Sequence, residues 1–384
     1  MTDCVFVIGG WPLSRDASGG ASPLSVSHLE LLAAAGLSVT VLALDHDTPP
    51  AAPAAAQVHT LAIQRGRSMA TLLSPYSVRA STMHALRDRI AADRPDLVWA
   101  ESLRPAALAA AAAYNAPLVY AHYDWNWKIK ALRSPERANG LRGKVRFWHR
   151  RRFEESLVRR AAGVVSGSHS ELESIRAVGA RHTAYLPPTY SRWAWPRPTS
   201  DPPRVVHVGG MATTANRIGM ERFMRVVWPG LPRATPLWVI GSLRGISDVL
   251  QDDLSSAGAQ MPGFVPDLRP VLRPYDIHII PWEHDTGTRT RIPLVLNAGQ
   301  VIVAMREAAA GSPEVVHDEN AVLVDTLEEM APAITALLAD AARRRRLGEA
   351  ARAAFETHFT QEALLPRLTA FLERVLPLRL PEQT

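Results

Sequence analysis

Short apolar segments, each followed by glycine or small polar residues, alternate along this chain with segments of helical periodicity. The segments "CVFVIGG" (4–10) and "LSVTVLAL" (37–44) flank one helical stretch, and "RVVHVGG" (204–210) and "PLWVIGS" (236–242) flank another. Strands that alternate with helices form parallel sheets whose two faces are covered by those helices. The sequence therefore predicts an α/β fold with doubly wound sheets, in which ligands bind beyond the carboxyl ends of the strands.

The alternation stops once, in the proline-rich stretch "LPPTYSRWAWPRPTSDPP" (186–203), and then begins again. A chain of 384 residues is long enough for two domains of ordinary size. We predict a first Rossmann-like domain over residues 1–190, a linker over 191–203 and a second domain over 204–360. Within the second domain, "PDLRPVLRP" (266–274) is predicted to form a helix.

The composition is that of a globular protein, with 47% hydrophobic and 21% charged residues. No apolar run reaches the roughly 18 to 20 residues of a membrane span, and the first residues lack the basic segment of a signal peptide. Cys4 is the single cysteine, which excludes a disulfide framework and a multi-cysteine metal site, so we expect a cytoplasmic protein. The net charge of +6 is compatible with an anionic ligand but does not require one.

Two arginines stand close together after one strand of the second domain. The segment "GTRTRIPLVLNAG" begins at Gly287, follows the apolar run "DIHIIPW" and places Arg289 and Arg291 at the start of a helix. A helix start offers free N–H groups and a positive dipole, and guanidinium groups bind phosphate oxygens in pairs. The pattern favours a diphosphate site. The alternative is that both arginines face water and pair with Glu283 or Asp285.

The order and spacing of these motifs resemble the C-terminal domain of retaining glycosyltransferases of the GT-B fold, family 4 (glycosyl transferases group 1). The similarity covers most of residues 204–375 and is looser in the first half of the chain. It is carried by an asparagine after the "VG" strand, by "G-x-V-x-D", and by "G-x-R-x-K" with arginine in the last position. These residues are Asn216; Gly263, Val265 and Asp267; and Gly287, Arg289 and Arg291.

This resemblance implies two Rossmann-like domains that face a central cleft, with a C-terminal helix over 361–384 that crosses back to the first domain. It implies transfer of a sugar from a UDP- or GDP-linked donor, with retention of configuration and without a metal ion or a cofactor. The acceptor would be a glycan, a lipid-linked molecule or a natural product. The two arginines would neutralise the departing diphosphate, on which charge develops in the transition state.

The resemblance also assigns residues to the two sides of the cleft. Catalytic roles fall to His122, Arg289 and Arg291. The donor side comprises Gly209, Gly210, Asn216, Gly263, Phe264, Val265, Gly287, Thr288, Arg289, Arg291, Asn297 and Glu314. The acceptor side comprises Gly9, Gly10, Gly19, Gly20, Asp124 and Asn126.

One position departs from the family pattern. Leu294 stands where the family usually has a glutamate that holds the ribose hydroxyls, and a leucine side chain forms no hydrogen bond. Either Asn297 or Glu314 compensates, or the nucleotide sits differently. A third reading is that the chain is a catalytically degenerate relative that binds nucleotide sugars.

Three side chains near the end of the strand "PLVYAHYD" (117–124) have two interpretations each. A histidine within a strand is commonly a core residue, but His122 lies at the carboxyl end, where the family has a histidine that contacts the donor sugar. Trp125 and Trp127 either stack on a sugar ring or pack against the protein.

Lysine and arginine are concentrated between Lys128 and Arg160, together with Phe147 and Trp148. A basic amphipathic helix near 144–160 either lies on anionic lipid at the inner face of the membrane or is solvated. A peripheral membrane-binding protein is therefore an alternative function. No recognised nucleic-acid module accompanies the basic residues, so we expect no nucleic-acid partner.

Overall fold

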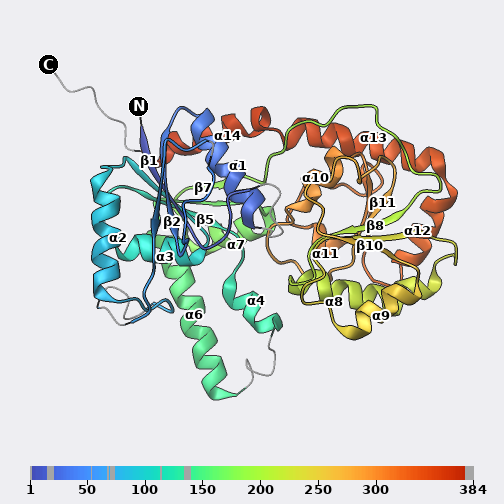
Figure 1. Ribbon diagram of the computed structural model, residues 1–384, viewed down its shortest axis with the longest axis horizontal. Coiled ribbons are helices and arrows are strands. Elements are labelled where there is room, and N and C mark those ends of the chain that lie inside the picture. The colour runs from blue at the N-terminus through green and yellow to red at the C-terminus, as the bar shows by residue number, and fades with distance from the viewer. Residues whose placement is uncertain are drawn as a thin grey trace.

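The computed structural model describes residues 2–376 except 15–20, 53, 67, 68, 70–73, 113, 114 and 134–139. Two lobes stand side by side, each with a parallel sheet at its centre and helices around it (Figure 1). This is the doubly wound α/β arrangement that the alternating sequence pattern predicts. The first sheet lies wholly before the proline-rich stretch 186–203, and the second lies wholly after it.

The first sheet has seven strands in the order β3-β2-β1-β4-β5-β6-β7, all of them parallel. Its central strands are buried on both faces because helices cover both, as a parallel sheet requires. The strands are β1 (Asp3–Ile8), β2 (Ser38–Leu44), β3 (Gln57–Leu61), β4 (Leu97–Glu101), β5 (Leu118–His122), β6 (Gly163–Ser166) and β7 (Thr183–Tyr185). The helices are α1 (Ala21–Ala34), α2 (Ala80–Ala92), α3 (Leu103–Ala111), α4 (Asn126–Arg133), α6 (Leu141–Arg160) and α7 (His169–Val178).

The second sheet has six parallel strands in the order β10-β9-β8-β11-β12-β13. The strands are β8 (Val205–Val208), β9 (Leu237–Ile240), β10 (Gln260–Gly263), β11 (Ile277–Ile280), β12 (Val301–Met305) and β13 (Ala321–Val324). The first helix, α8 (Thr214–Arg222), continues as a π-helix, η2 (Phe223–Val227), and a 3-10 turn, η3 (Trp228–Gly230). The others are α9 (Asp248–Ser256), α10 (Arg291–Asn297), α11 (Arg306–Ala309), α12 (Met330–Ala339) and α13 (Ala341–His358).

The last helix, α14 (Gln361–Val375), belongs in space to the first lobe. It leaves α13 above the second sheet and runs back over the first (Figure 1), where it packs on α1 and β7. Its buried face includes Leu364, Leu368 and Phe371, and the Phe371 ring meets the Trp99 ring edge-on at 6.5 Å. Residues 377–384 of the expected terminal segment lie outside the described residues.

The helix predicted over 266–274 is wrong, because the structure has consecutive turns there. Leu272 N donates to the Leu268 carbonyl oxygen at 2.9 Å, which closes a single turn. Pro270 and Pro274 lack an N–H donor and their rings clash with the preceding turn of a helix. Proline spacing therefore overrides the helical periodicity of the leucine and valine side chains.

Both sheets reverse their strand order next to the first strand of their domain. In the first sheet, β2 and β3 lie on one side of β1, and the chain then crosses to the other side of β1, where β4 pairs with it. In the second sheet, β9 and β10 lie on one side of β8, and β11 pairs with β8 on the other side. In doubly wound sheets, a crevice forms at such a reversal, outside the carboxyl ends of the strands. The fold therefore predicts that ligands bind beside the turns that follow β1, β4, β8 and β11.

Candidate active site

A cavity of about 640 Å³ lies beyond the carboxyl ends of β8 and β9. The second domain supplies most of the lining, the linker supplies residues 190–194, and α1 supplies Pro23. It therefore occupies the crevice that the topology places beside the strand reversal. This cavity, called the larger cavity below, is lined by several of the residues predicted for the donor side: Gly209, Gly210, Asn216, Phe264, Val265, Thr288, Arg289 and Arg291.

Arg291 is held firmly against the end of β8. It opens α10, and its Nη1 donates to the Val208 carbonyl oxygen at 2.5 Å while its Nη2 donates to Asn216 Oδ1. Burial, followed by the nearby positive charge of Arg289, lowers the pKa of Arg291 to about 9. A guanidinium in this position gains from a bound anion, because the anion offsets both burial and like-charge repulsion.

Arg289 is less constrained than Arg291. Its Nη2 reaches Thr286 Oγ1 at 3.5 Å, its Cζ lies 6.0 Å from the centre of the Trp282 ring, and its buried Nε has no hydrogen-bond partner within the described structure. Burial lowers the pKa of Arg289 to about 10, although the charges of Asp124 and Asp285 oppose that shift. Arg289 is therefore held by fewer contacts than Arg291, and its side chain lines the cavity.

The two carboxylates that could have neutralised this arginine pair have other partners. Glu283 forms an ion pair with Arg222 at 2.5 Å, and Asp285 accepts a hydrogen bond from Ser170 Oγ at 2.7 Å. The alternative in which Arg289 and Arg291 simply pair with these acids does not describe the structure.

Two glycines permit close approaches at this site. A Cβ on Gly209 would lie 2.4 Å from Asn216 Nδ2 and 3.0 Å from Arg291 Nη1. Gly287 has a φ of 63°, and a Cβ there would lie 1.6 Å from Asp124 Oδ1 of the first domain. Glycine at these positions brings Arg291 onto the β8 turn and brings Asp124 against the loop that carries Arg289.

A second, smaller cavity of about 220 Å³ adjoins the first between the two domains. The first domain lines it with Leu24, Tyr123 and Asp124 and with Ile129 and Leu132 of α4. The second domain contributes residues 213–215, Trp282, Thr286 and residues 288–290. The two cavities share Thr213, Thr288, Arg289 and Thr290, so they meet at Arg289.

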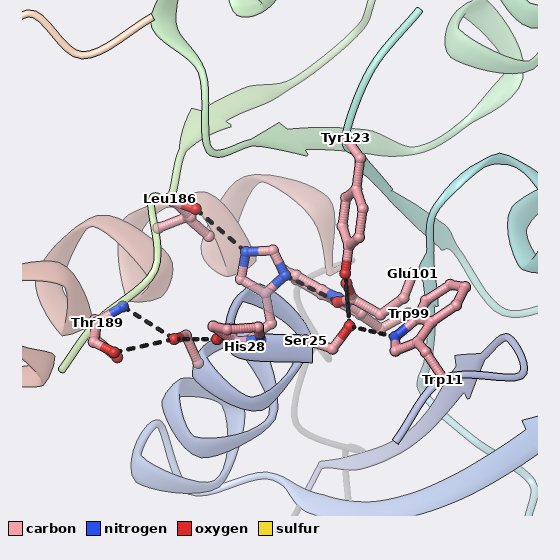
Figure 2. A network of polar contacts seen from close by, with 10 residues as sticks. Trp11, Ser25, His28, Trp99, Glu101, Tyr123, Leu186 and Thr189 are labelled. Carbon is pink, nitrogen blue, oxygen red and sulfur yellow. Dashed lines mark hydrogen bonds and ion pairs between the residues drawn. The ribbon is translucent and has the colours of Figure 1, made fainter. Parts of the chain in front are cut away.

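A buried polar network holds the first-domain wall of the smaller cavity. Figure 2 shows Glu101, at the end of β4, surrounded by donors from α1, from β4 itself and from the residue after β5. Its carboxylate accepts from His28 Nδ1 at 2.8 Å, Trp99 Nε1 at 2.7 Å, Ser25 Oγ at 3.3 Å and the Tyr123 hydroxyl. Burial and the charge of Glu101 raise the pKa of Tyr123 well above its usual range, so this hydroxyl stays protonated. The sequence analysis missed Glu101, although an acid that ends a wholly apolar strand signals such a site.

His122 lies inside the first domain, away from the linings of both cavities. It is 1% exposed, its ring meets the Trp125 ring at 4.7 Å, and neither ring nitrogen has a hydrogen-bond partner among the described residues. Burial lowers its pKa to about 3. A neutral, enclosed imidazole does not contact a donor sugar in this arrangement, so we leave His122 out of the catalytic set proposed below.

The two side chains expected to replace the ribose-binding glutamate also point elsewhere. Asn297 is fully buried, where its Oδ1 accepts from Trp193 N at 3.1 Å and its Nδ2 donates to the Ser191 carbonyl oxygen at 2.9 Å. Glu314 accepts from the Tyr185 hydroxyl at 3.0 Å, across the domain boundary. Neither residue lines the larger cavity, whereas Leu294 does.

The other predicted residues in the described part of the chain, Gly9, Gly10, Gly263 and Asn126, line neither cavity. Gly9 follows β1 and its carbonyl oxygen accepts from His46 Nε2 at 2.9 Å, and Gly10 lies beside Asp45. Gly263 ends β10, just before the cavity-lining Phe264, and Asn126 begins α4. Gly19 and Gly20 lie outside the described residues.

Both tryptophans after β5 pack against the protein. Trp125 is buried and donates from Nε1 to Ser174 Oγ at 2.7 Å. Trp127 lies under Arg151, whose Cζ is 5.3 Å from the ring centre. The stacking interpretation does not fit these positions.

The basic segment forms α4 and α6, and α6 projects away from the body of the first lobe (Figure 1). Its outer half exposes three apolar side chains at helical spacing: Leu141 is 80% exposed, Val145 57% and Trp148 59%. Arginine and lysine residues lie between and beside them. None of the helices among the described residues is long and apolar enough to cross a membrane.

Both halves of the chain match family models for glycosyltransferases. Residues 19–189 match a glycosyl transferase 4-like domain, and residues 202–340 match the glycosyl transferases group 1 domain. The two matched ranges together cover most of the chain, and the chain belongs to this family. The protein is thus a glycosyltransferase, and the family predicted from the sequence is confirmed.

Solved structures share the fold at low sequence identity. Anabaena HepE in complex with UDP is 16% identical, with a TM-score of 0.69 over 97% of this chain and 100% of that chain. Sucrose-phosphate synthase from Thermosynechococcus elongatus is 17% identical, with a TM-score of 0.72 over 98% of this chain and 99% of that chain. WaaG, a glycosyltransferase involved in lipopolysaccharide biosynthesis, is 13% identical, with a TM-score of 0.64 over 96% and 98% of the two chains. A search among curated proteins gives no sequence match. The similarity confirms the GT-B fold.

Proposed function

We propose that this protein transfers a sugar, with retention of configuration, from a UDP- or GDP-linked donor bound in the larger cavity. The observation that carries the proposal is the pair of half-buried guanidinium groups of Arg289 and Arg291 at one end of that cavity. Burial disfavours both charges, and the nearest acids of their own loop have other partners. A diphosphate supplies the missing negative charge.

The diphosphate lies between these arginines and the turn after β8. Gly209 and Gly210 leave backbone space there, and the start of α8 follows directly. Arg291 has a fixed position, whereas Arg289 has one long contact from Nη2 to Thr286 Oγ1 and can adjust to charge as it develops on the departing phosphate. The guanidinium charges take the role that a metal ion has in other phosphate sites, so the reaction needs neither a metal ion nor a cofactor.

The nucleobase lies at the opposite end of the cavity, against residues 264–265. Phe264 is 44% exposed and offers a ring face for stacking, and the turn that follows β10 lines the cavity through residues 264–265. The lining of the cavity extends from this turn to Arg289, so a nucleotide bound in it has its base at one end and its diphosphate at the other.

The acceptor binds in the smaller cavity, because that cavity meets the larger one at Arg289. The Tyr123 hydroxyl, which donates to Glu101 and contacts Ser25 Oγ at 2.6 Å, gives this cavity a polar wall beside the acceptor. In the front-face route, the acceptor oxygen bonds to the sugar carbon while the bond to the phosphate breaks. The leaving phosphate oxygen takes the acceptor proton, so no protein nucleophile is needed.

Calorimetric titration with UDP and with GDP tests the donor site. We expect the wild-type chain to bind at least one of them, and Arg289→Ala and Arg291→Ala each to weaken binding about tenfold or more, as loss of a charge-assisted hydrogen bond does. Transfer from a panel of nucleotide sugars should fall by roughly 10²-fold or more in both variants. Arg306→Ala is the control, because Arg306 is an exposed arginine paired with Asp325. Undiminished nucleotide affinity in both site variants would rule out the site.

We further propose that the protein works in the cytoplasm at the inner face of the membrane. The support is the exposed apolar side of α6, Leu141, Val145 and Trp148, set among basic residues on the helix that projects from the lobe carrying the acceptor wall. Such a surface fits the headgroup region of an anionic bilayer.

A further inference from the structure

One wall of the larger cavity is apolar where a nucleotide site needs a polar group. Leu294 lies on α10 three residues after Arg291, so both side chains are on the same side of the helix. Leu294 lines the cavity and packs with Val208 and Ile240 at the ends of β8 and β9 and with Val265. The wall between the arginine pair and the nucleobase end is therefore built from aliphatic side chains.

The carboxylate in the cavity lining is committed to a neighbour. Asp267 Oδ1 accepts from Arg269 N at 2.9 Å and from Arg269 Nε at 2.9 Å, and its Oδ2 lies 3.1 Å from the same Nε. Asn297 and Glu314 bond to other partners outside the cavity. The other polar side chains of the lining are neutral, as in Thr213, Asn216 and Ser242, or are arginines.

The sugar ring of a nucleotide must lie between its base and its diphosphate, and hence beside Leu294. Nucleotide sites that recognise ribose do so with a carboxylate that accepts from the 2′-hydroxyl. A site built to bond a hydroxyl rejects the analogue that lacks it, whereas an apolar site discriminates weakly. Replacing the hydroxyl by hydrogen at an aliphatic wall leaves no buried group without its partner.

We propose that this donor site does not select for the ribose 2′-hydroxyl, so that 2′-deoxyribonucleoside diphosphate sugars serve as donors as well as their ribonucleoside counterparts. The proposal rests on the proposed function, because it takes the larger cavity to be the donor site. It adds a substrate class, set by the single position Leu294.

The test compares UDP with 2′-deoxy-UDP, which differ by one hydroxyl group. Calorimetry on the full chain should give dissociation constants within about fivefold of each other, as expected when no charged group bonds the hydroxyl. Leu294→Glu places a carboxylate on that wall and should raise the preference for UDP to about tenfold or more. Leu294→Met, which keeps the wall apolar, should leave the ratio unchanged.

A wild-type preference of more than about tenfold for UDP would overturn this inference and leave the donor site intact. If neither uridine nucleotide binds, GDP and 2′-deoxy-GDP are compared in the same way, and failure of all four nucleotides to bind would overturn the proposed function, and this inference with it. If Leu294→Glu does not fold, the wild-type ratio alone still decides, because the two nucleotides probe the same unmodified site.

Discussion

Arg289 and Arg291 have the same charge but different surroundings. Arg291 is fixed by the Val208 carbonyl and Asn216, whereas Arg289 has a buried Nε without a partner in the described structure and lines both cavities. A rigid cation fixes the position of a ground-state phosphate, and a cation with free donors can strengthen its contacts as charge develops. Under the proposed function, we expect Arg291 mainly to hold the diphosphate and Arg289 to contribute more to the transition state.

Gly287 links the two domains at the same loop. We expect Gly287→Ala to lower the free energy of unfolding by more than Gly258→Ala, and to reduce transfer as well. Both glycines have positive φ, 63° and 69°, and an L residue in that region costs roughly 1 to 2 kcal/mol. Only at Gly287 does the added Cβ also collide with Asp124, because the space around Gly258 is open.

Urea denaturation and turnover of both variants measure this difference. Gly258→Ala is the matched control, since it carries the backbone strain without the clash. Equal losses of stability, with turnover unchanged in both, would show that the Asp124 contact has no role at the site.

At the scale of elements, uniform apolar runs were the reliable sequence signal. The strands β2, β11 and β12 lie within the runs 37–44, 276–282 and 300–305 that were predicted as strands, because burial on both faces demands continuous apolar sequence. The short edge strands β3 and β7 were not predicted; each lies at a sheet edge, and β3 mixes polar and apolar side chains. The false helix over 266–274 came from reading periodicity without weighing its prolines.

The direction of a side chain at a strand end was harder to predict than the strand itself. The position of His122 at the carboxyl end of a strand favoured a role in the site, but alternate residues of a strand point to the same face. His122 therefore lies on the same face as Tyr120, 5.4 Å from its ring, in the core of the first domain. Tyr123, one residue later, lines the smaller cavity instead. The arginine pair was easier to place, because a helix start after a strand points to the crevice wherever the sheet is parallel.

The projecting half of α6 gives a prediction at this scale. We expect the protein to bind vesicles that contain phosphatidylglycerol about tenfold or more tightly than vesicles of phosphatidylcholine, because each basic residue near an anionic surface contributes roughly 1 kcal/mol. Trp148→Ser should weaken that binding, since Trp148 is an exposed apolar residue of the surface. Co-sedimentation measures both effects.

Val249→Ser is the control variant for the vesicle experiment. Val249 is 70% exposed on α9 of the second domain, so its replacement removes a comparable apolar side chain from another surface. Equal binding by both vesicle types, or equal losses in the two variants, would mean that α6 is a solvated helix.

At the scale of the whole molecule, the start of α7 joins the two domains. His169 N donates to the Gly311 carbonyl oxygen at 2.8 Å, and Ser170 Oγ donates to Asp285 at 2.7 Å. Gly287 N donates to Glu171 Oε1 at 3.4 Å, while Oε2 is buried without a partner in the described structure. Three consecutive residues of the first domain thus contact the loops of the second domain that surround Arg289.

Glu171 should make the stability of this junction depend on pH. Burial raises the pKa of Glu171 to about 7 from its usual value of 4.5. Asp124 and Asp285 add to this shift, and Lys128 and the Gly287 N–H oppose it. A raised pKa means that the stabilising contribution is present below about pH 4.5 and is lost as the pH rises through about 7, by up to roughly 3 kcal/mol.

Glu171→Gln keeps an acceptor for Gly287 N and removes the titration. Urea denaturation of the wild type and the variant, measured from pH 5 to about pH 8, should show the wild type losing stability relative to the variant as the pH rises. Parallel curves would show that Glu171 does not titrate in this range.

The most direct test of the account is a crystal structure with UDP bound. We expect the diphosphate oxygens to lie within hydrogen-bond distance of Arg289 and Arg291, beside the turn that contains Gly209 and Gly210, with the ribose against Leu294. A nucleotide bound elsewhere, or in this cavity with its diphosphate directed to solvent and in contact with neither guanidinium group, would contradict it.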